Sequence, residues 1–169
     1  MMNKDRKQTV ETNENEIIFT RVFEAPRDLV FETYTTCEHL MNWWGPREWP
    51  LNYCKIDFRE GGSWHYCMKG PKPEDESWGL AMYKKITEPE IIMYDDHFSD
   101  KDGNVNSKMP SLEINVTFKL LDGKTEMKTI TKVGSKEEID KLIDMGMIEG
   151  FTETWDRLEE HLVVIQPDR

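Results

Sequence analysis

The sequence predicts an α+β protein in which an antiparallel sheet of about seven strands packs against one long C-terminal helix. Three observations predict this class. One strand and two short helices come first, a run of strands follows from Leu51, and the final segment changes to helical periodicity. A sheet with one solvated face needs an element to cover its other face, and the final helix is long enough to do so.

The composition indicates a packed, soluble protein. Of 169 residues, 37% are hydrophobic, and six Trp and ten Met are too many for a disordered chain. The chain has neither the roughly 18 consecutive apolar residues of a membrane span nor the apolar stretch of a signal peptide near its start. Its net charge of −11 argues against a nucleic-acid partner, because phosphate groups repel an acidic surface. We therefore expect a cytoplasmic protein with no membrane span.

Residues 1–15 are polar and aperiodic, so we expect a disordered N-terminal tail, followed by a single domain over residues 16–165. The first strand begins at Glu16, where β-branched and aromatic residues are concentrated. Ala25-Pro26 ends this strand, because the residue before a proline avoids helical geometry. Pro26 then suits the first turn of a helix, where its missing N–H costs no hydrogen bond.

A second short helix is expected in the segment CEHLMNWW, which Gly45-Pro46 closes. Six strands should follow it, separated by turns rich in Gly, Pro and Asp. The clearest is the segment over residues 112–120, where apolar and polar side chains alternate strictly. Asp122-Gly123 joins that strand to the next one as a hairpin.

The last segment begins with Ser135 and Glu138, which have the spacing of a capping box. Gly146 and Gly150 mark a break or a close approach near the start of the helix, because each costs about 1 kcal/mol against Ala in a regular helix. Further on, apolar residues repeat at spacings of three and four, which predicts an amphipathic helix. These residues are Ile148, Phe151, Trp155, Leu158, Leu162 and Ile165.

The three cysteines, Cys37, Cys54 and Cys67, cannot all pair within the chain. No Cys-x-x-Cys pair offers the start of a structural zinc site. We therefore expect reduced thiols, in keeping with a cytoplasmic location.

Several segments resemble, in the right order, the START-like, helix-grip domains of the SRPBCC superfamily that are related to activator of Hsp90 ATPase. FTRVFEAPRDLVFETYTTCEHLMNWWGP contains an Arg strand, an Ala-Pro turn and a Trp-Trp-Gly-Pro turn like those of the family. DFREGGSWHYCMKGP resembles its Gly-Gly strand. EGFTETWDRLEEHL resembles its closing helix, which commonly carries Gly-Trp where this chain has Gly150-Phe151. The resemblance runs from about Ile17 to Leu162.

The resemblance implies a curved sheet that grips the long helix, with a cavity between them. Related proteins hold apolar molecules there, such as lipids, sterols or polyketides, and some related families use the cavity as an enzyme site. The two-domain co-chaperones of the family dock to the chaperone largely through a separate N-terminal domain. Only about 15 residues precede the first strand here, which counts against direct activation of the chaperone.

Strand alternation places candidate cavity residues together. Trp64 and Tyr66 should face inward on one strand, and Trp78 and Met82 should do so on the next. Ile92, Tyr94 and Phe98 should face inward on the strand after that. Together these residues predict an aromatic and Met-rich inner surface. The same residues would also suit a solid core, and one Trp of the Trp-Trp turn is expected to be structural. The candidate ligand-binding residues are Trp43, Trp44, Trp64, Tyr66, Trp78, Met82, Tyr94, Met147, Phe151 and Trp155.

Arg21 shares its strand face with Ile17, Phe19 and Phe23, an unusual position for a guanidinium group. It could anchor the carboxylate of a ligand. We favour a structural pair with an acidic side chain of the protein.

Three small groups of titratable residues lack the geometry of a metal or nucleophile site. They are Cys37 with His39, His65 with Cys67, and Asp95 with Asp96 and His97. The first pair would not face each other on a helix, the second should lie on the wet face of the sheet, and the third suits a solvated strand end. The sequence therefore predicts no catalytic residue, no metal and no cofactor, and favours a protein that is not an enzyme.

Three hypotheses for function follow. The first is non-catalytic binding of a small apolar or amphipathic ligand between sheet and helix, linked to the stress response. The second is a chaperone-linked or other protein-interaction module with a solid core, and a homodimer is a further partner that the sequence leaves open. The third is an enzyme, which would need a titratable group inside the cavity.

Overall fold

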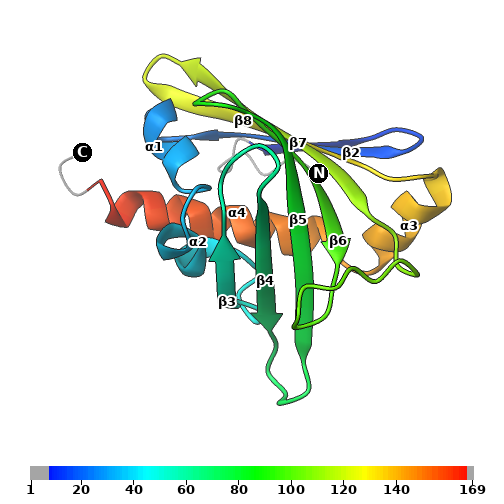
Figure 1. Cartoon of the computed structure of the whole chain (residues 1–169). Helices are drawn as coiled ribbons and strands as arrows, with labels where there is room; N and C mark the ends of the chain where they lie inside the picture. The colour runs from blue at the N-terminus through cyan, green and yellow to red at the C-terminus, as the bar shows by residue number, and fades with distance from the viewer. Residues whose placement is uncertain (1–7, 167–169) are drawn as a thin grey trace.

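The computed structural model describes residues 8–166, in which one antiparallel sheet curves around the long C-terminal helix (Figure 1). In chain order the strands are β1 (Gln8–Thr12), β2 (Glu16–Phe23), β3 (Leu51–Ile56), β4 (Ser63–Lys69), β5 (Glu76–Thr87), β6 (Ile91–Phe98), β7 (Leu112–Leu121) and β8 (Lys124–Lys132). The helices are α1 (Arg27–Glu32), α2 (Cys37–Trp43), α3 (Lys136–Asp144) and α4 (Met147–Val164). Within these residues no helix is both long enough and apolar enough to cross a membrane.

The strand order is β1-β2-β8-β7-β6-β5-β4-β3, and every neighbouring pair is antiparallel. From β3 to β8 the chain runs back and forth between adjacent strands, and β8 then pairs with β2. The two short helices therefore carry the chain from β2 to the opposite edge of the sheet, at β3. The two short helices, α1 and α2, and the six strands from β3 to β8 agree with the sequence prediction.

The predicted N-terminal tail is wrong for Gln8–Thr12, which form β1 and pair with β2. The sheet therefore has eight strands, one more than expected. β1 has a single apolar residue, Val10, which packs against the core. Its sequence has no strand period, and it is the free edge of β2 that makes it a strand. Residues 1–7 of the predicted tail lie outside the described residues.

The C-terminal helical segment divides into α3 and α4. Ser135 caps α3 by accepting a hydrogen bond from the backbone N–H of Glu138, as the capping box predicts. Gly146 separates the two helices with a φ of +92°, which L side chains rarely adopt. Gly150 lies inside α4, where an added Cβ would come within 3.4 Å of Pro46, so both predicted features of this segment are present.

The interior between β2 and α4 is filled with aromatic side chains. The ring centroids of Phe19 and Phe151 lie 4.3 Å apart, and those of Phe23 and Trp155 lie 5.3 Å apart. Trp155 is fully buried, and its indole N–H donates to the hydroxyl of Tyr34 at 3.2 Å. This part of the helix-grip interior is a packed core.

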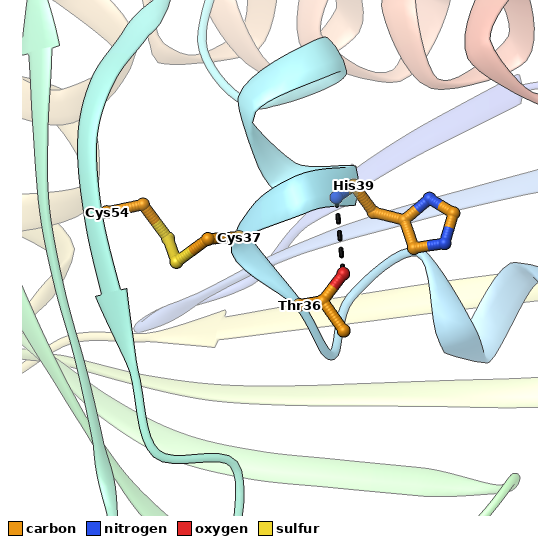
Figure 2. Close-up of a disulfide and its surroundings, with 4 residues drawn as sticks. All are labelled: Thr36, Cys37, His39 and Cys54. Carbon is orange, nitrogen blue, oxygen red and sulfur yellow. Dashed lines mark hydrogen bonds between the residues drawn. A yellow bond between two sulfur atoms is a disulfide. The ribbon is translucent and has the colours of Figure 1, made fainter.

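Cys37 and Cys54 form a disulfide, so the expectation of three reduced thiols is wrong (Figure 2). The bond joins the first turn of α2 to β3, across a sequence separation of 17 residues. Cys67 is a free, buried thiol, and burial raises its pKa. The pair depends on α2 packing beside β3, which no local sequence pattern reveals. The cysteine argument for a reducing compartment therefore no longer holds.

Candidate functional site

Arg21 of β2 is fully buried and is surrounded by acceptors. Its guanidinium group donates to Glu159 at 2.6 Å and lies 3.0 Å from the carboxylate of Asp156, both on α4. It also donates to the side chain of Gln8 at 2.6 Å and to the carbonyl of Thr152 at 3.3 Å. These contacts confirm the structural pair with acidic side chains, so Arg21 ties the sheet to α4.

The Trp-Trp turn after α2 leads into β4 through a series of ring contacts. Trp43 is fully buried, and its indole N–H donates to the carbonyl of Thr33 at 3.0 Å, which makes it the structural member of the pair. Trp44 lies 4.9 Å from Trp64, and Trp64 lies 4.5 Å from Tyr66, measured between ring centroids. Trp44 therefore packs against Trp64, which in turn packs against the ring of Tyr66.

Arg157 of α4 holds this turn in place. Its guanidinium group donates to the carbonyls of Asn42, Trp44 and Gly45 at 3.2, 3.1 and 2.8 Å. These carbonyls lie in and just after the last turn of α2, where no further helical partner is available. Arg157 of the long helix therefore holds the backbone at Trp44, whose ring is the first in the series of contacts that leads to Tyr66.

The predicted orientation of β5 is wrong. Tyr66 of β4 pairs with Gly79 of β5, so Gly79 faces inward and Trp78 faces outward. The ring of Trp78 packs against His65 at 5.1 Å on the outer face, and Met82 is 40% exposed. A period of two identifies two faces without saying which is buried, and here the small residues of β5 face the large rings of β4.

A pocket of about 160 Å³ lies where β4 and β6 end and β5 and β7 begin. It is lined by Tyr66, Met68, Ser77, Trp78, Gly79, Asp96, His97, Phe98 and Leu112. All of these residues belong to strands of the sheet, and α4 contributes none. We call this site the Tyr66–Asp96 pocket. We had expected a cavity between the sheet and α4. The pocket instead lies at one end of the sheet.

A carboxyl group and a phenol are the polar pair of this pocket. The hydroxyl of Tyr66 donates to the carboxylate of Asp96, lying 2.9 Å from each oxygen. Loss of solvent around the carboxyl group raises the pKa of Asp96 to about 6, and the hydrogen bond from Tyr66 offsets only part of this effect. Burial, followed by the nearby charge of Asp96, raises the pKa of Tyr66 well above its usual value.

Gly79 makes the position of Tyr66 possible. A Cβ atom at Gly79 would lie 2.3 Å from Cζ and 2.4 Å from the hydroxyl oxygen of Tyr66. The phenol therefore lies directly over the backbone of β5, and only glycine leaves room for it there.

Asp96 is the residue that sequence reasoning missed. We expected it at a solvated strand end, yet it lines the pocket and pairs across to Ala81 on the inner face of β5. The signal was present, because Asp96 lies at an even spacing from Ile92, Tyr94 and Phe98, which were expected to face inward. The Tyr66–Asp96 pocket therefore holds a titratable group of the kind that the enzyme hypothesis required.

The other candidate ligand-binding residues lie elsewhere. Phe151 and Trp155 pack against β2, and Met147 is partly buried against the core. Tyr94 is buried, with its ring 6.0 Å from that of Tyr83. Of the ten predicted residues, Tyr66 and Trp78 border the Tyr66–Asp96 pocket.

On the outer face, three rings from neighbouring strands form a second aromatic group. Tyr53 lies 5.4 Å from His65 and 5.3 Å from Trp78. Tyr53 is 37% exposed, and Nε2 of His65 lies 3.0 Å from the carbonyl oxygen of Asp100. We call Tyr53, His65 and Trp78 the outer aromatic cluster.

His39 lies apart from both sites. Its Nδ1 is 2.9 Å from Nε2 of His161, and its Nε2 is 3.1 Å from a carboxylate oxygen of Glu32. Burial, followed by the charge of His39, lowers the pKa of His161. Across residues 8–166, no three or more His, Cys, Asp or Glu side chains converge as metal ligands would.

A curved antiparallel sheet that grips one long C-terminal helix defines the START-like, helix-grip class of proteins, and this chain has that fold. The family described as "Activator of Hsp90 ATPase homolog 1-like protein" matches residues 24–163. The chain belongs to this family.

Solved structures of bacterial proteins share the fold. A protein from Staphylococcus epidermidis is 32% identical, with a TM-score of 0.78 over 91% of this chain and 93% of its own. One from Mycobacterium smegmatis is 28% identical, with a TM-score of 0.81 over 90% and 95%. One from Arthrobacter aurescens is 26% identical, with a TM-score of 0.83 over 91% and 90%. A search among curated proteins finds no match.

Proposed function

We propose that this protein binds a small amphipathic molecule in the Tyr66–Asp96 pocket without transforming it. The observation that carries the proposal is a carboxyl group held with one phenol partner inside a pocket that Met68, Phe98 and Leu112 line. Ligand sites are typically apolar recesses with a few placed polar groups. Ionisable groups with shifted pKa values are also concentrated at such sites, which supports a functional role for Asp96.

The volume of the pocket limits the ligand. A cavity of about 150 Å³ holds a benzene molecule, whereas drug-sized ligands occupy about 300 Å³ or more. At about 160 Å³ the Tyr66–Asp96 pocket suits one ring or a short chain, and a sterol would not fit. Burying roughly 100 Å² of apolar surface contributes about 2.5 kcal/mol before the costs of association. We therefore expect weak binding, in the high-micromolar to millimolar range.

Protein-observed NMR suits this range of affinity. Titration with 2-phenylethanol should shift the backbone amides of Gly79, Asp96 and Phe98 and leave those of β2 unchanged. The variant Ser77→Phe should abolish the shifts, because the new ring fills the pocket. Lys85→Phe adds the same ring at an exposed site on β5 and should bind like the wild type. Shifts elsewhere, or equal shifts in both variants, would overturn the proposal.

A second candidate is a protein-interaction module, and the outer aromatic cluster is the observation that favours it. Tyr53 and Met82 are both more than a third exposed on this face. The ATPase rate of the Hsp90 chaperone from the same cells, with and without this protein, separates the two candidates. Ligand binding alone predicts an unchanged rate, whereas an effect that Tyr53→Ser removes would favour the interaction module.

A cytoplasmic, stress-linked role is part of the proposal, and the family relationship supports it. Fractionation of cells before and after heat shock measures both properties. We expect the protein in the cytoplasmic fraction and at a higher level after the shock. Recovery outside the cytoplasm would contradict the location. The measurement is informative because the Cys37–Cys54 disulfide is of a kind found mainly outside reducing compartments.

A further inference from the structure

We propose that the Tyr66–Asp96 pocket selects ligands that carry a cationic amine, whose ammonium group pairs with Asp96 while the apolar part lies against Met68, Phe98 and Leu112. This inference rests on the proposed function and adds the chemical class of the ligand. It follows from the hydrogen bonds and charges around one carboxylate.

The carboxylate of Asp96 has unused capacity to accept hydrogen bonds. A carboxylate offers about four acceptor positions, and the hydroxyl of Tyr66 is its one hydrogen-bond donor among residues 8–166. In the same part of the chain, no Lys, Arg or His forms an ion pair with it. Its neighbour Asp95 shows the contrast, because it has a cation, Lys84, at 3.0 Å. The charge of Asp96 is therefore left for a partner that enters the pocket.

The groups around Asp96 supply no competing positive charge. Tyr66, Tyr83 and Tyr94 are buried phenols, and burial raises the pKa of each, so all three are neutral. His97 also borders the pocket, but it is paired with Leu80 in the register that puts alternate residues on the outer face. Among the described residues that line the pocket, the inner face therefore presents one carboxylate beside aromatic rings and aliphatic side chains, and an ammonium group complements both.

Charge also disfavours the other ligand classes. A fatty acid or another carboxylate ligand would bring its anionic head against Asp96, in a protein whose net charge is −11. A neutral alcohol can donate one hydrogen bond to Asp96 but brings no compensating charge. A charge-assisted hydrogen bond contributes about twice as much as a neutral one, so we expect an amine to bind roughly tenfold tighter than the matching alcohol.

Three compounds with one ring and a two-carbon linker test this inference. They are 2-phenylethylamine, 2-phenylethanol and 3-phenylpropionate, titrated at pH 7.5 into the full chain and followed by NMR. The variant Asp96→Asn removes the charge and keeps the side-chain shape and the acceptor for Tyr66. Asp95→Asn is the matched control, because it removes a carboxylate one residue away that Lys84 neutralises.

We expect the amine to bind about tenfold tighter than the alcohol and the carboxylate to bind weakest. This preference should disappear in Asp96→Asn and persist in Asp95→Asn. Equal binding of amine and alcohol to the wild type would overturn the inference and leave the proposed function standing. An amine preference that survives in Asp96→Asn would overturn it too, because the overall negative charge would then be the cause. Binding of none of the three compounds would overturn both proposals.

Discussion

Arg21 and Asp96 are both charged side chains on the inner face of the sheet, and the fold surrounds them differently. Arg21 has two carboxylates, an amide oxygen and a backbone carbonyl as partners. Asp96 has one phenol and a pocket beside it. A fully partnered buried charge holds elements together, whereas an incompletely partnered one is available to a ligand. This difference supports the proposal that the ligand site lies at the end of the sheet formed by β4 to β7.

The packing around the two charges differs in the same way. Phe23 and Trp155 both lie within 6 Å of the Arg21 guanidinium carbon, measured to their ring centroids. Around Asp96, the missing side chain of Gly79 makes room for the ring of Tyr66, and a pocket lies beside the carboxyl group. The packing around Arg21 stabilises the fold, whereas the region around Asp96 retains a carboxylate whose desolvation is destabilising.

The largest effect is expected at Arg21. Arg21→Met should lower the free energy of unfolding by about 3–5 kcal/mol, because it leaves Asp156 and Glu159 beside a buried apolar side chain. Urea unfolding at pH 7 measures the change. The matched control is Arg47→Met, which breaks an exposed pair with Glu160 and should cost less than about 1 kcal/mol. Equal costs for the two variants would show that the Arg21 network adds little.

Reduction of the Cys37–Cys54 disulfide should be the next largest effect. Closing a loop of this length stabilises a fold by about 3 kcal/mol, because it limits the unfolded chain. Hydrogen exchange with and without reductant measures where stability is lost. We expect faster exchange in α2 and in β3, which pairs with β4 of the pocket, and a smaller change around Arg21. Uniform loss across the sheet would contradict a regional difference.

A smaller loss is expected for Gly79→Ala. The added Cβ would overlap the ring of Tyr66 and displace its hydroxyl from Asp96, at a cost of about 2–3 kcal/mol. The NMR shifts of the Tyr66 ring should change, and 2-phenylethanol should bind less well. Ala81→Gly, at the neighbouring inward position, is the control for a change of the same size without a new clash. Unchanged Tyr66 shifts would show that β5 accommodates the methyl group.

The smallest effect, and one of opposite sign, is expected for Asp96→Asn. Since the pKa of Asp96 is about 6 in the folded protein and near 3.8 when unfolded, wild-type stability falls as the pH rises from about 4 to 6. Above that window the variant should be more stable by about 1–2 kcal/mol, since each pKa unit corresponds to about 1.36 kcal/mol and the pocket admits some solvent. Near pH 4 the difference should vanish. Thermal unfolding at several pH values measures it, and a constant difference would contradict the shifted pKa.

Local patterns in the sequence determined most of the secondary structure. The alternation over residues 112–120, the Asp122-Gly123 turn and the Ser135 cap each act over a few residues, and all are present in the fold. The family resemblance added the curved sheet around the last helix. These features could be predicted because propensity and periodicity are properties of neighbouring residues.

The tertiary structure alone decided the features that depend on distant segments. β1 forms because β2 offers a free edge, and Cys37 meets Cys54 because α2 packs beside β3. The inward face of β5 is set by pairing with β4, which places Gly79 under Tyr66. A period of two could tell us that Asp96 lies with Phe98, but only the assembled sheet shows that this face ends in a pocket. Local sequence determines which way side chains alternate, and the packing of distant strands determines which of them meet.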